Sequence, residues 1–347
     1  MAETVRPLSE RVSAPVELAL PEHVDIARWR AATSADIDAI WDLVLAISRV
    51  DHPNFLAARE EVAEDFGFSF FDATTDSLLG FSANGALLAY GTVIISPGRR
   101  TLVKSKVSGG VHPQWRARGI GRVLLEWQLG RARQQLASSE QTLPGWIQAY
   151  ADERAPQNAR LLEHAGLSVA RYFVELQRVL ADPIRGGELG EGLRLAPYSA
   201  GVSVAVHAAH DEAFADHWSS QPLSDESWAS FTAAETFRSE LSFVVYGTDA
   251  AGREQVAGYL LSTVNPDDWE GAGFSSSYIA LVGVLRDWRG RHIAQALLGA
   301  HLVASRAAGH DRATLDVDTD SPTGAVGLYT GMGFVAAHRE LVFTREF

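Results

Sequence analysis

The sequence predicts an α/β (α+β) fold made of two tandem domains, each with a mixed, mostly antiparallel sheet flanked by helices. Two observations support this prediction. Residues 111–125 read VHPQWRARGIGRVLL and residues 284–298 read VLRDWRGRHIAQALL, and seven positions match without a gap. A glycine-rich stretch at 182–192, DPIRGGELGEG, lies between the two blocks and excludes a regular element there. A block that occurs once in each half indicates a duplicated domain.

The first half shows alternating strand and helix signals after an arm, residues 1–25, that is rich in Pro, Glu and Ala and lacks periodicity. A short strand at Arg28 precedes a Thr/Ser cap and a helix. One face of that helix carries Ile37, Ile40, Trp41, Val44 and Leu45. We then expect strands at 76–83, 86–95 and 101–111, a helix to about residue 137, a strand at 146–150, a helix at 156–164 and a strand at 169–180.

The second half repeats this order. We expect strands at 192–195, 241–246, 255–264, 276–284, 313–317 and 335–344, and helices at 203–214, from the second block to about residue 308, and at 324–330. Gly166-Leu167 corresponds to Gly333-Phe334, and the residues that follow match at the same spacing. The closing strands of the two halves should therefore occupy equivalent places in two similar folds.

Composition excludes several classes of protein. The 347 residues are 46% hydrophobic, enough for two packed cores, and no run of about 18 apolar residues indicates a transmembrane helix. The chain has no cysteine, which excludes disulfides, thiolate metal sites and a cysteine nucleophile. A net charge of −13 argues against a nucleic-acid partner and is compatible with an amine substrate. The N-terminal residues lack the apolar segment of a signal peptide, so we expect a cytoplasmic protein without membrane contact.

Each copy of the repeated block predicts a strand, a tight turn and a helix whose first turn carries arginines. Positive side chains at a helix N-terminus are unfavourable for the helix dipole. A bound anion removes this conflict, because free backbone N–H groups and guanidinium groups then point at it. The sequence therefore predicts two phosphate-binding cradles.

The cradles read RARGIG at 116–121 and RGRHIA at 289–294, and the second half closes with GLYTGMGF at 327–334. In this strand and helix context the pattern resembles the GCN5-related N-acetyltransferases (GNAT). The resemblance covers about residues 28–347 in two copies. The tandem arrangement is similar to that of mycothiol synthase-like, two-domain actinobacterial acetyltransferases. It implies an arm at 1–25, a GNAT domain at 26–181, a linker at 182–192 and a second GNAT domain at 193–347.

The resemblance implies that acetyl-CoA is the cosubstrate, that no metal takes part, and that the CoA pyrophosphate rests on a cradle. The thioester carbonyl then bonds a backbone N–H of the preceding strand, which stabilises the developing oxyanion. The residues implied in acetyl-CoA binding are Val282, Val284, Arg289, Arg291, His292, Ile293 and Ala294 in the second half, and Val111, Arg116, Arg118, Gly119, Ile120 and Gly121 in the first.

The two halves differ in the group that could protonate the departing thiolate. Tyr329 lies four residues before Gly333, and the resemblance implies that a tyrosine at this spacing is the acid, a role that suits a phenol. The corresponding residue before Gly166 is Leu162, which cannot exchange a proton. We therefore assign the chemistry to the second half. The alternative for Tyr329 is an ordinary half-buried aromatic on an amphipathic helix.

The general base is less clearly indicated. The segment LDVDTD at 315–320 places Asp316, Asp318 and Asp320 on one side of an extended strand end, and we select Asp318 as the catalytic base. Asp316, together with His217 and Asp216, is a candidate substrate contact. A solvated strand end and ordinary helix or loop residues are the respective alternatives.

The leading hypothesis is an acetyl-CoA-dependent N-acetyltransferase that transfers an acetyl group to the primary amine of a small molecule by direct attack on the thioester. The alternative is a catalytically silent acyl-CoA-binding sensor or scaffold. We expect either a monomer that forms its own pseudo-dimer or a homodimer.

Overall fold

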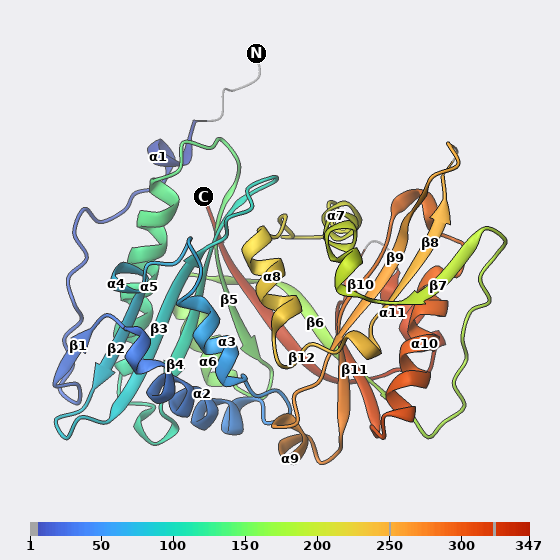
Figure 1. Ribbon diagram of the computed structural model, residues 1–347. Coiled ribbons are helices and arrows are strands. Elements are labelled where there is room, and N and C mark those ends of the chain that lie inside the picture. The colour runs from blue at the N-terminus through green and yellow to red at the C-terminus, as the bar shows by residue number, and fades with distance from the viewer. Residues whose placement is uncertain (1–5, 250, 322–323) are drawn as a thin grey trace. The chain divides into compact units, whose positions relative to one another are not determined.

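The computed structural model describes residues 6–249, 251–321 and 324–347, and the chain divides into two compact units (Figure 1). Unit 1 comprises Met1–Tyr172 and Glu340–Phe347, and unit 2 comprises Phe173–Arg339. The units therefore differ from the sequence halves 26–181 and 193–347, because each contains the end of the other half's closing strand. Within the described ranges, no helix combines the length and apolar character needed to cross a membrane.

Unit 1 contains a sheet in the order β1-β2-β3-β4-β5-β12. All neighbouring strands are antiparallel except β4 and β5. The strands are β1 (Arg28–Arg30), β2 (Ser77–Phe81), β3 (Leu87–Ile95), β4 (Val103–Val111), β5 (Gly145–Asp152) and β12 (Val335–Glu346). The helices are α1 (Leu8–Arg11), α2 (Ile37–Asp51), α3 (Arg59–Asp65), α4 (Ala73–Asp76), α5 (Ile120–Ala137) and α6 (Pro156–His164).

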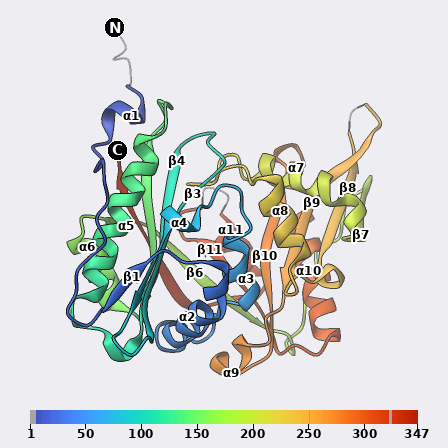
Figure 2. The same ribbon diagram turned by 60° about the vertical axis from the view of Figure 1, so that its left-hand side comes forward.

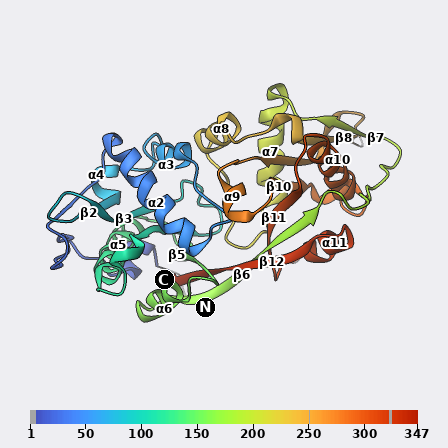
Figure 3. The same cartoon turned by 90° about the horizontal axis from the view of Figure 1, so that it is seen from below.

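Helices cover both faces of the unit 1 sheet. Strand residues alternate between the two faces, so neighbouring residues of one strand enter different cores. Leu78 packs in the core beneath α5, whereas Leu79 packs with Ile40 of α2. Figure 2 allows α5 to be followed along β3 and β4, and Figure 3 shows α2 and α5 on opposite sides of these strands. The result is a three-layer unit.

Unit 2 contains a sheet in the order β7-β8-β9-β10-β11-β6. Only β10 and β11 are parallel neighbours. The strands are β6 (Ser168–Val179), β7 (Leu193–Pro197), β8 (Phe243–Thr248), β9 (Glu254–Thr263), β10 (Ser276–Val284) and β11 (Arg312–Asp318). The helices are α7 (Ser203–Ala213), α8 (Asp225–Ala233), α9 (Asp268–Ala272), α10 (Ile293–Ala307) and α11 (Ala325–Gly331).

The closing strands occupy equivalent places, as the matched spacing predicts, but they are exchanged. β12 pairs with β5 through Glu340–Glu346, and β6 pairs with β11 through Phe173–Val179. Phe343 is fully buried in the core of unit 1, and Leu176 is 1% exposed in the core of unit 2. Each half of the sequence therefore supplies the last strand of the other half's sheet.

Several local features differ from the sequence-based expectations. The arm contains the short helix α1, whose Leu8 is fully buried, while residues 1–5 lie outside the described ranges. Helices α3, α4, α8 and α9 were not predicted. Asp320 lies in a turn after β11, so only Asp316 and Asp318 share the extended strand.

Candidate functional site

The parallel strand pair of each unit stops pairing part-way along its length. β4 pairs with β5 up to the row Lys106–Gln148, and β10 pairs with β11 up to the row Tyr278–Thr314. Beyond these rows β10 continues to Val284 and β11 to Asp318. Backbone groups on the inner edges of the separated strands are thus available to a ligand.

β10 also carries a bulge that its counterpart β4 lacks. The register with β9 passes from Ile279 directly to Leu281, so Ala280 has no opposite residue. β4 pairs with β3 without interruption from Ser105 to Val111. A bulge leaves the extra residue unpaired and bends the strand. The bulge lies just beyond the last row that β10 shares with β11, and it leaves the backbone of Ala280 outside the ladder with β9.

The second cradle is the turn that leads into α10. Gly290 and His292 have positive φ angles of 76° and 58°, and His292 is the N-cap of the helix. The first N–H groups of α10, from Ile293 and Ala294, have no partner within the helix. Alternation of right- and left-handed residues with free N–H groups forms an anion-binding concavity. The predicted residues of this cradle therefore converge on one helix start.

The arginines of the second cradle are not neutralised. Arg289 donates from Nε to the Val284 carbonyl at 3.2 Å and from Nη2 to the Ala213 carbonyl at 3.3 Å. Arg291 lies over the Trp288 ring, 4.9 Å from its centroid. Among the described residues, neither guanidinium forms an ion pair with a carboxylate. Both side chains are exposed.

The first cradle has the same backbone form, with Ala117 at φ 60° and Gly119 at φ 96°. Its arginines, however, are paired with acids. Arg116 makes two bonds to Asp51, at 2.7 and 3.0 Å, and the Asn158 amide donates to the same carboxylate at 3.1 Å.

The arm neutralises the second arginine of the first cradle. Arg118 lies 3.8 Å from the Asp25 carboxylate. His23, also on the arm, bonds the Arg118 carbonyl oxygen at 2.8 Å. Its Nε2 lies only 3.5 Å from the position that a Cβ on Gly119 would occupy. The first cradle thus supplies its own counter-charges.

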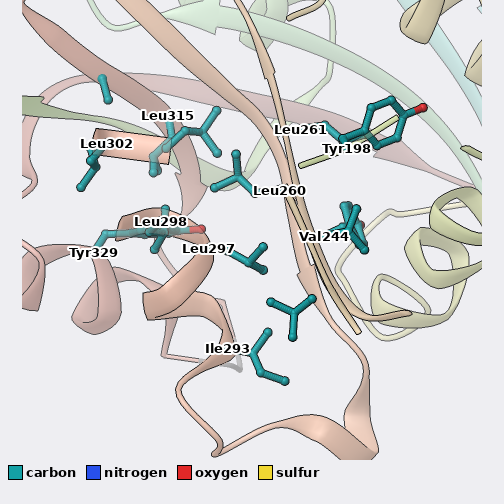
Figure 4. Close-up of a cluster of buried hydrophobic side chains, with 14 of the residues drawn as sticks. Tyr198, Val244, Leu260, Leu261, Ile293, Leu297, Leu298, Leu302, Leu315 and Tyr329 are labelled. Carbon is teal, nitrogen blue, oxygen red and sulfur yellow. The ribbon is translucent and has the colours of Figure 1, made fainter. Parts of the chain in front are cut away.

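Tyr329 lies on α11 in the core of unit 2, and Leu162 lies on α6 in unit 1. The Tyr329 ring is 6% exposed and packs edge-on against Phe334, with the ring centroids 5.8 Å apart. Figure 4 shows Tyr329 in the same apolar cluster as Leu297 and Leu298. Burial raises the pKa of Tyr329 to about 12, so the phenol stays protonated at neutral pH. Within the described part of the chain its hydroxyl makes no hydrogen bond.

The carboxylates of β11 have different surroundings. Asp316 is exposed and accepts a hydrogen bond of 2.9 Å from the hydroxyl of Tyr278, the last residue of β10 that pairs with β11. Asp318 is 2% exposed, and its Oδ1 accepts from the Asp320 backbone N–H at 2.9 Å. No cation pairs with Asp318 among the residues described. Asp316 is opposite Glu175 of β6, so this face of the sheet is acidic.

The two other predicted substrate contacts lie after α7. Asp216 forms an ion pair with Arg286, and both side chains are exposed. His217 packs near Phe173 and Phe214, with ring centroids 6.5 and 5.4 Å away. No cluster of three metal-ligating His, Cys, Asp or Glu side chains occurs in the described ranges.

Sequence patterns alone did not identify Tyr278, the bulge at Ala280, or the acids that pair with the first cradle. Tyr278 lies six residues before Val284, but only the strand register brings its hydroxyl to Asp316. Asp51 is separated by 65 residues from Arg116, and no local spacing connects them. Strand alternation gives the face of Tyr278 within its own strand, but its shared row with Thr314, which brings it to the acidic face, comes from the register.

The comparisons with known proteins agree with this geometry. The Acetyltransferase (GNAT) family model matches residues 204–334. A curated relative from Salinispora tropica, named mycothiol acetyltransferase, is 30% identical over 343 residues, which cover 95% of each chain. A GCN5-related N-acetyltransferase structure from Sphaerobacter thermophilus has a TM-score of 0.66 and 29% identity, and the match covers 92% of this chain and 95% of that one. A tandem GNAT protein from the clavulanic acid biosynthesis pathway has a TM-score of 0.64, 17% identity and coverage of 92% and 98%, and it supports the fold alone.

Proposed function

The chain belongs to the GNAT acetyltransferase family, and from this premise we propose that unit 2 transfers an acetyl group from acetyl-CoA to the primary amine of a small molecule. The observation that carries this assignment is the difference in charge between the cradles. Arg289 and Arg291 keep their charges free, whereas Arg116 and Arg118 face Asp51 and Asp25. An anionic pyrophosphate gains most where the cationic groups have no other partner.

In this proposal the acyl-CoA pyrophosphate is held by the start of α10 and by Arg289 and Arg291. When bound, the cosubstrate supplies an activated thioester. Val282 and Val284 present the edge of β10 to its pantetheine part, and the Ala280 N–H stabilises the oxyanion. The bulge supports this role, because it removes Ala280 from the ladder with β9.

Asp316 is proposed to bind the ammonium form of the acceptor, with Tyr278 fixing the direction of its carboxylate. The Tyr278 hydroxyl donates to Oδ2 at 2.9 Å and so holds the carboxylate in one orientation. A carboxylate oriented in this way makes a charge-assisted hydrogen bond to the amine. Asp318 accepts the proton that the amine releases, directly or through water. Its place at the end of β11, two residues after Asp316, supports this role.

Tyr329 is proposed to protonate the CoA thiolate as it leaves. Its pKa of about 12 keeps the phenol protonated over the working pH range. The absence of a competing hydrogen bond in the described residues leaves the O–H available. General-acid catalysis of this kind contributes about 10²- to 10⁴-fold to the rate.

The acceptor is proposed to be a polar amine of the mycothiol type, after the name of the full-length relative. Purified protein should be incubated with acetyl-CoA and a panel of amines, including a mycothiol-type amine, a polyamine and an amino sugar, and CoA release should be followed. Turnover with one of these amines supports the proposal. Tight acetyl-CoA binding without turnover of any amine contradicts it and supports a silent binding module.

A further inference from the structure

Unit 1 contains a polar cluster at the place where unit 2 carries Tyr278 and Asp316. Lys106 and Gln148 form the last paired row of β4 and β5, as Tyr278 and Thr314 do in β10 and β11. Residues that are opposite each other in neighbouring strands share one face of a sheet. Alternation also places Lys104 on this face, and Tyr150 follows Gln148 by two residues. The position that carries an acidic side chain in unit 2 therefore carries basic side chains in unit 1.

Gln148 is the most informative member of this cluster. Its side chain is 1% exposed, and neither Nε2 nor Oε1 has a hydrogen-bond partner among the described residues. Burial of an amide without partners costs about 1–3 kcal/mol for each unmet group. Thr344, which lies opposite Gln148 on β12, is also buried, at 3% exposure. The buried amide requires a partner that offers both an acceptor and a donor.

The charged groups around Gln148 define the sign of that partner. Lys106 lies over the Tyr150 ring, with Nζ 5.5 Å from the centroid, and Tyr150 is 38% exposed. Burial, assisted by repulsion from Lys106, lowers the pKa of Lys104 to about 8. Asp65 of α3 faces Lys106, and burial raises the pKa of its carboxyl to about 6.

Two further acids complete this electrostatic environment. After burial, the charge of Glu64 also raises the pKa of Asp65, and the charge of Glu340 also raises the pKa of Tyr150. Both lie beside the cluster and not in the row that contains Gln148. Lys106 shares the row with Gln148, and its ammonium group favours an anionic partner there.

We propose that Lys104, Lys106, Gln148 and Tyr150 form a second ligand site, on the unit 1 sheet, for a small molecule that carries a carboxylate next to a hydroxyl or N–H donor. The carboxylate accepts from Lys106 and from Gln148 Nε2, and the adjacent donor bonds Gln148 Oε1. The ligand chemistry is thus opposite to that of the amine site in unit 2. This site is independent of the proposed acetyl transfer, because it uses neither cradle nor any residue assigned to catalysis.

Titration of the full chain with lactate, acetate, lactamide and inorganic phosphate, by calorimetry and by NMR of the Gln148 side-chain amide and Lys104 Cε, tests the proposal. Lactate has both the carboxylate and the hydroxyl donor. It should bind saturably and shift both signals. Acetate, which lacks the donor, loses the neutral bond to Gln148 Oε1 and should bind roughly fivefold more weakly, and lactamide, which lacks the charge, loses a charge-assisted bond and should bind at least roughly tenfold more weakly. Phosphate binding as tight as that of lactate would overturn the carboxylate assignment.

Variants separate this site from the transferase site. Gln148→Leu and Lys106→Met should each weaken lactate binding at least tenfold, while Asp316→Asn in unit 2 serves as the matched control and should bind lactate normally. If Gln148→Leu does not fold, Lys106→Met and the wild-type amide signal still decide the question. Equal lactate affinity in wild type and Lys106→Met, or no saturable binding of any acid, overturns the proposal and leaves water as the partner of Gln148. None of these measurements depends on acetyl transfer.

Discussion

The two cradles come from the same repeated block, yet their arginines have different partners. In unit 1 the bidentate Arg116–Asp51 pair and the Arg118–Asp25 contact satisfy both charges within the fold. Among the described residues of unit 2, Arg289 contacts backbone carbonyls and Arg291 lies over the Trp288 ring, as Arg118 lies over the Trp115 ring in unit 1, but neither arginine of unit 2 meets a carboxylate. The same motif is therefore neutralised by carboxylates in one unit and left charged in the other, and the nearest carboxylates decide the difference.

The largest expected effect is the loss of turnover in Tyr329→Phe. The ring and its packing against Phe334 are kept, so the melting temperature should change little. Removal of the acid should lower turnover by about 10²-fold or more without weakening acetyl-CoA binding. Steady-state rates and calorimetric affinities measure the two quantities separately.

Tyr198→Phe is the matched control for this change. Tyr198 is also a buried tyrosine of unit 2, at 6% exposure, and its hydroxyl lacks a partner among the described residues. Its loss should leave turnover unchanged. Full activity in Tyr329→Phe would remove the main distinction between α11 and the Leu162 helix.

The second effect concerns stability. Asp51 is 3% exposed, so Asp51→Ala leaves the Arg116 guanidinium without its buried partner. Breaking such a pair should lower the free energy of unfolding by roughly 3 kcal/mol. Arg289→Ala should change it by less than about 1 kcal/mol and should instead weaken acetyl-CoA binding. Denaturant unfolding and calorimetry on both variants test the contrast, which fails if the two variants behave alike.

The third effect separates the units by pH. His301 on α10 is fully buried, and burial lowers its pKa to about 4; the corresponding residue of α5 is Gln128, which does not titrate. In the unfolded chain the imidazole takes up a proton near its ordinary pKa of about 6.5, whereas in the folded chain it stays neutral down to about pH 4. Stability is therefore fully present above pH 6.5 and is lost as the pH falls toward 4, by up to roughly 3 kcal/mol for this group.

His301→Gln should remove part of this acid sensitivity. Gln128 donates to the carbonyls of Thr92 and Ser108, so an amide suits an equivalent position between helix and sheet. Unfolding free energies at pH 5 and pH 7 should differ less in the variant than in the wild type. His210, whose pKa burial also lowers to about 4, should retain the remaining dependence. An unchanged difference would show that His301 does not contribute to it.

The smallest effect concerns backbone strain in the second cradle. His292 has φ 58°, a left-handed conformation that disfavours a side chain, whereas the first cradle has Gly119 at the corresponding N-cap. His292→Gly should raise the free energy of unfolding by about 1 kcal/mol. Gly119→Ala should lower it by a similar amount. Thermal unfolding should therefore show changes in stability of opposite sign for the two variants. Changes of the same sign would contradict the correspondence between His292 and Gly119.

Most of the fold could be predicted from the sequence, because the repeat reveals the order of the elements twice and a long helix such as α2 has a clear apolar stripe. The strand exchange could not be predicted, since the segments after Gly166 and Gly333 match at the same spacing and suit either sheet. The short helix α8 lacked a periodic stripe, although the Ser224 hydroxyl accepts a bond from the Ser227 N–H and caps it.

The candidate site was partly accessible in the same way. Its cradle residues and Tyr329 lie in local motifs that the sequence reveals. The Tyr278–Asp316 bond, the bulge at Ala280 and the acids beside the first cradle depend on strand register and on contacts distant in sequence. No single-sequence pattern encodes such contacts, so the proposed roles of Tyr278 and Ala280 became apparent only from the three-dimensional structure.

The strand exchange has a consequence for synthesis on the ribosome. One edge of β5 is covered by Glu340–Glu346, so the sheet of unit 1 cannot be completed before these residues have been made. At about 5–20 residues per second, the nascent chain carries this open edge for on the order of ten seconds or more. An unpaired edge recruits other strands. Chains that stall before residue 340 should therefore be prone to aggregation and should depend on chaperones, even though every residue of β1 to β5 has already been made.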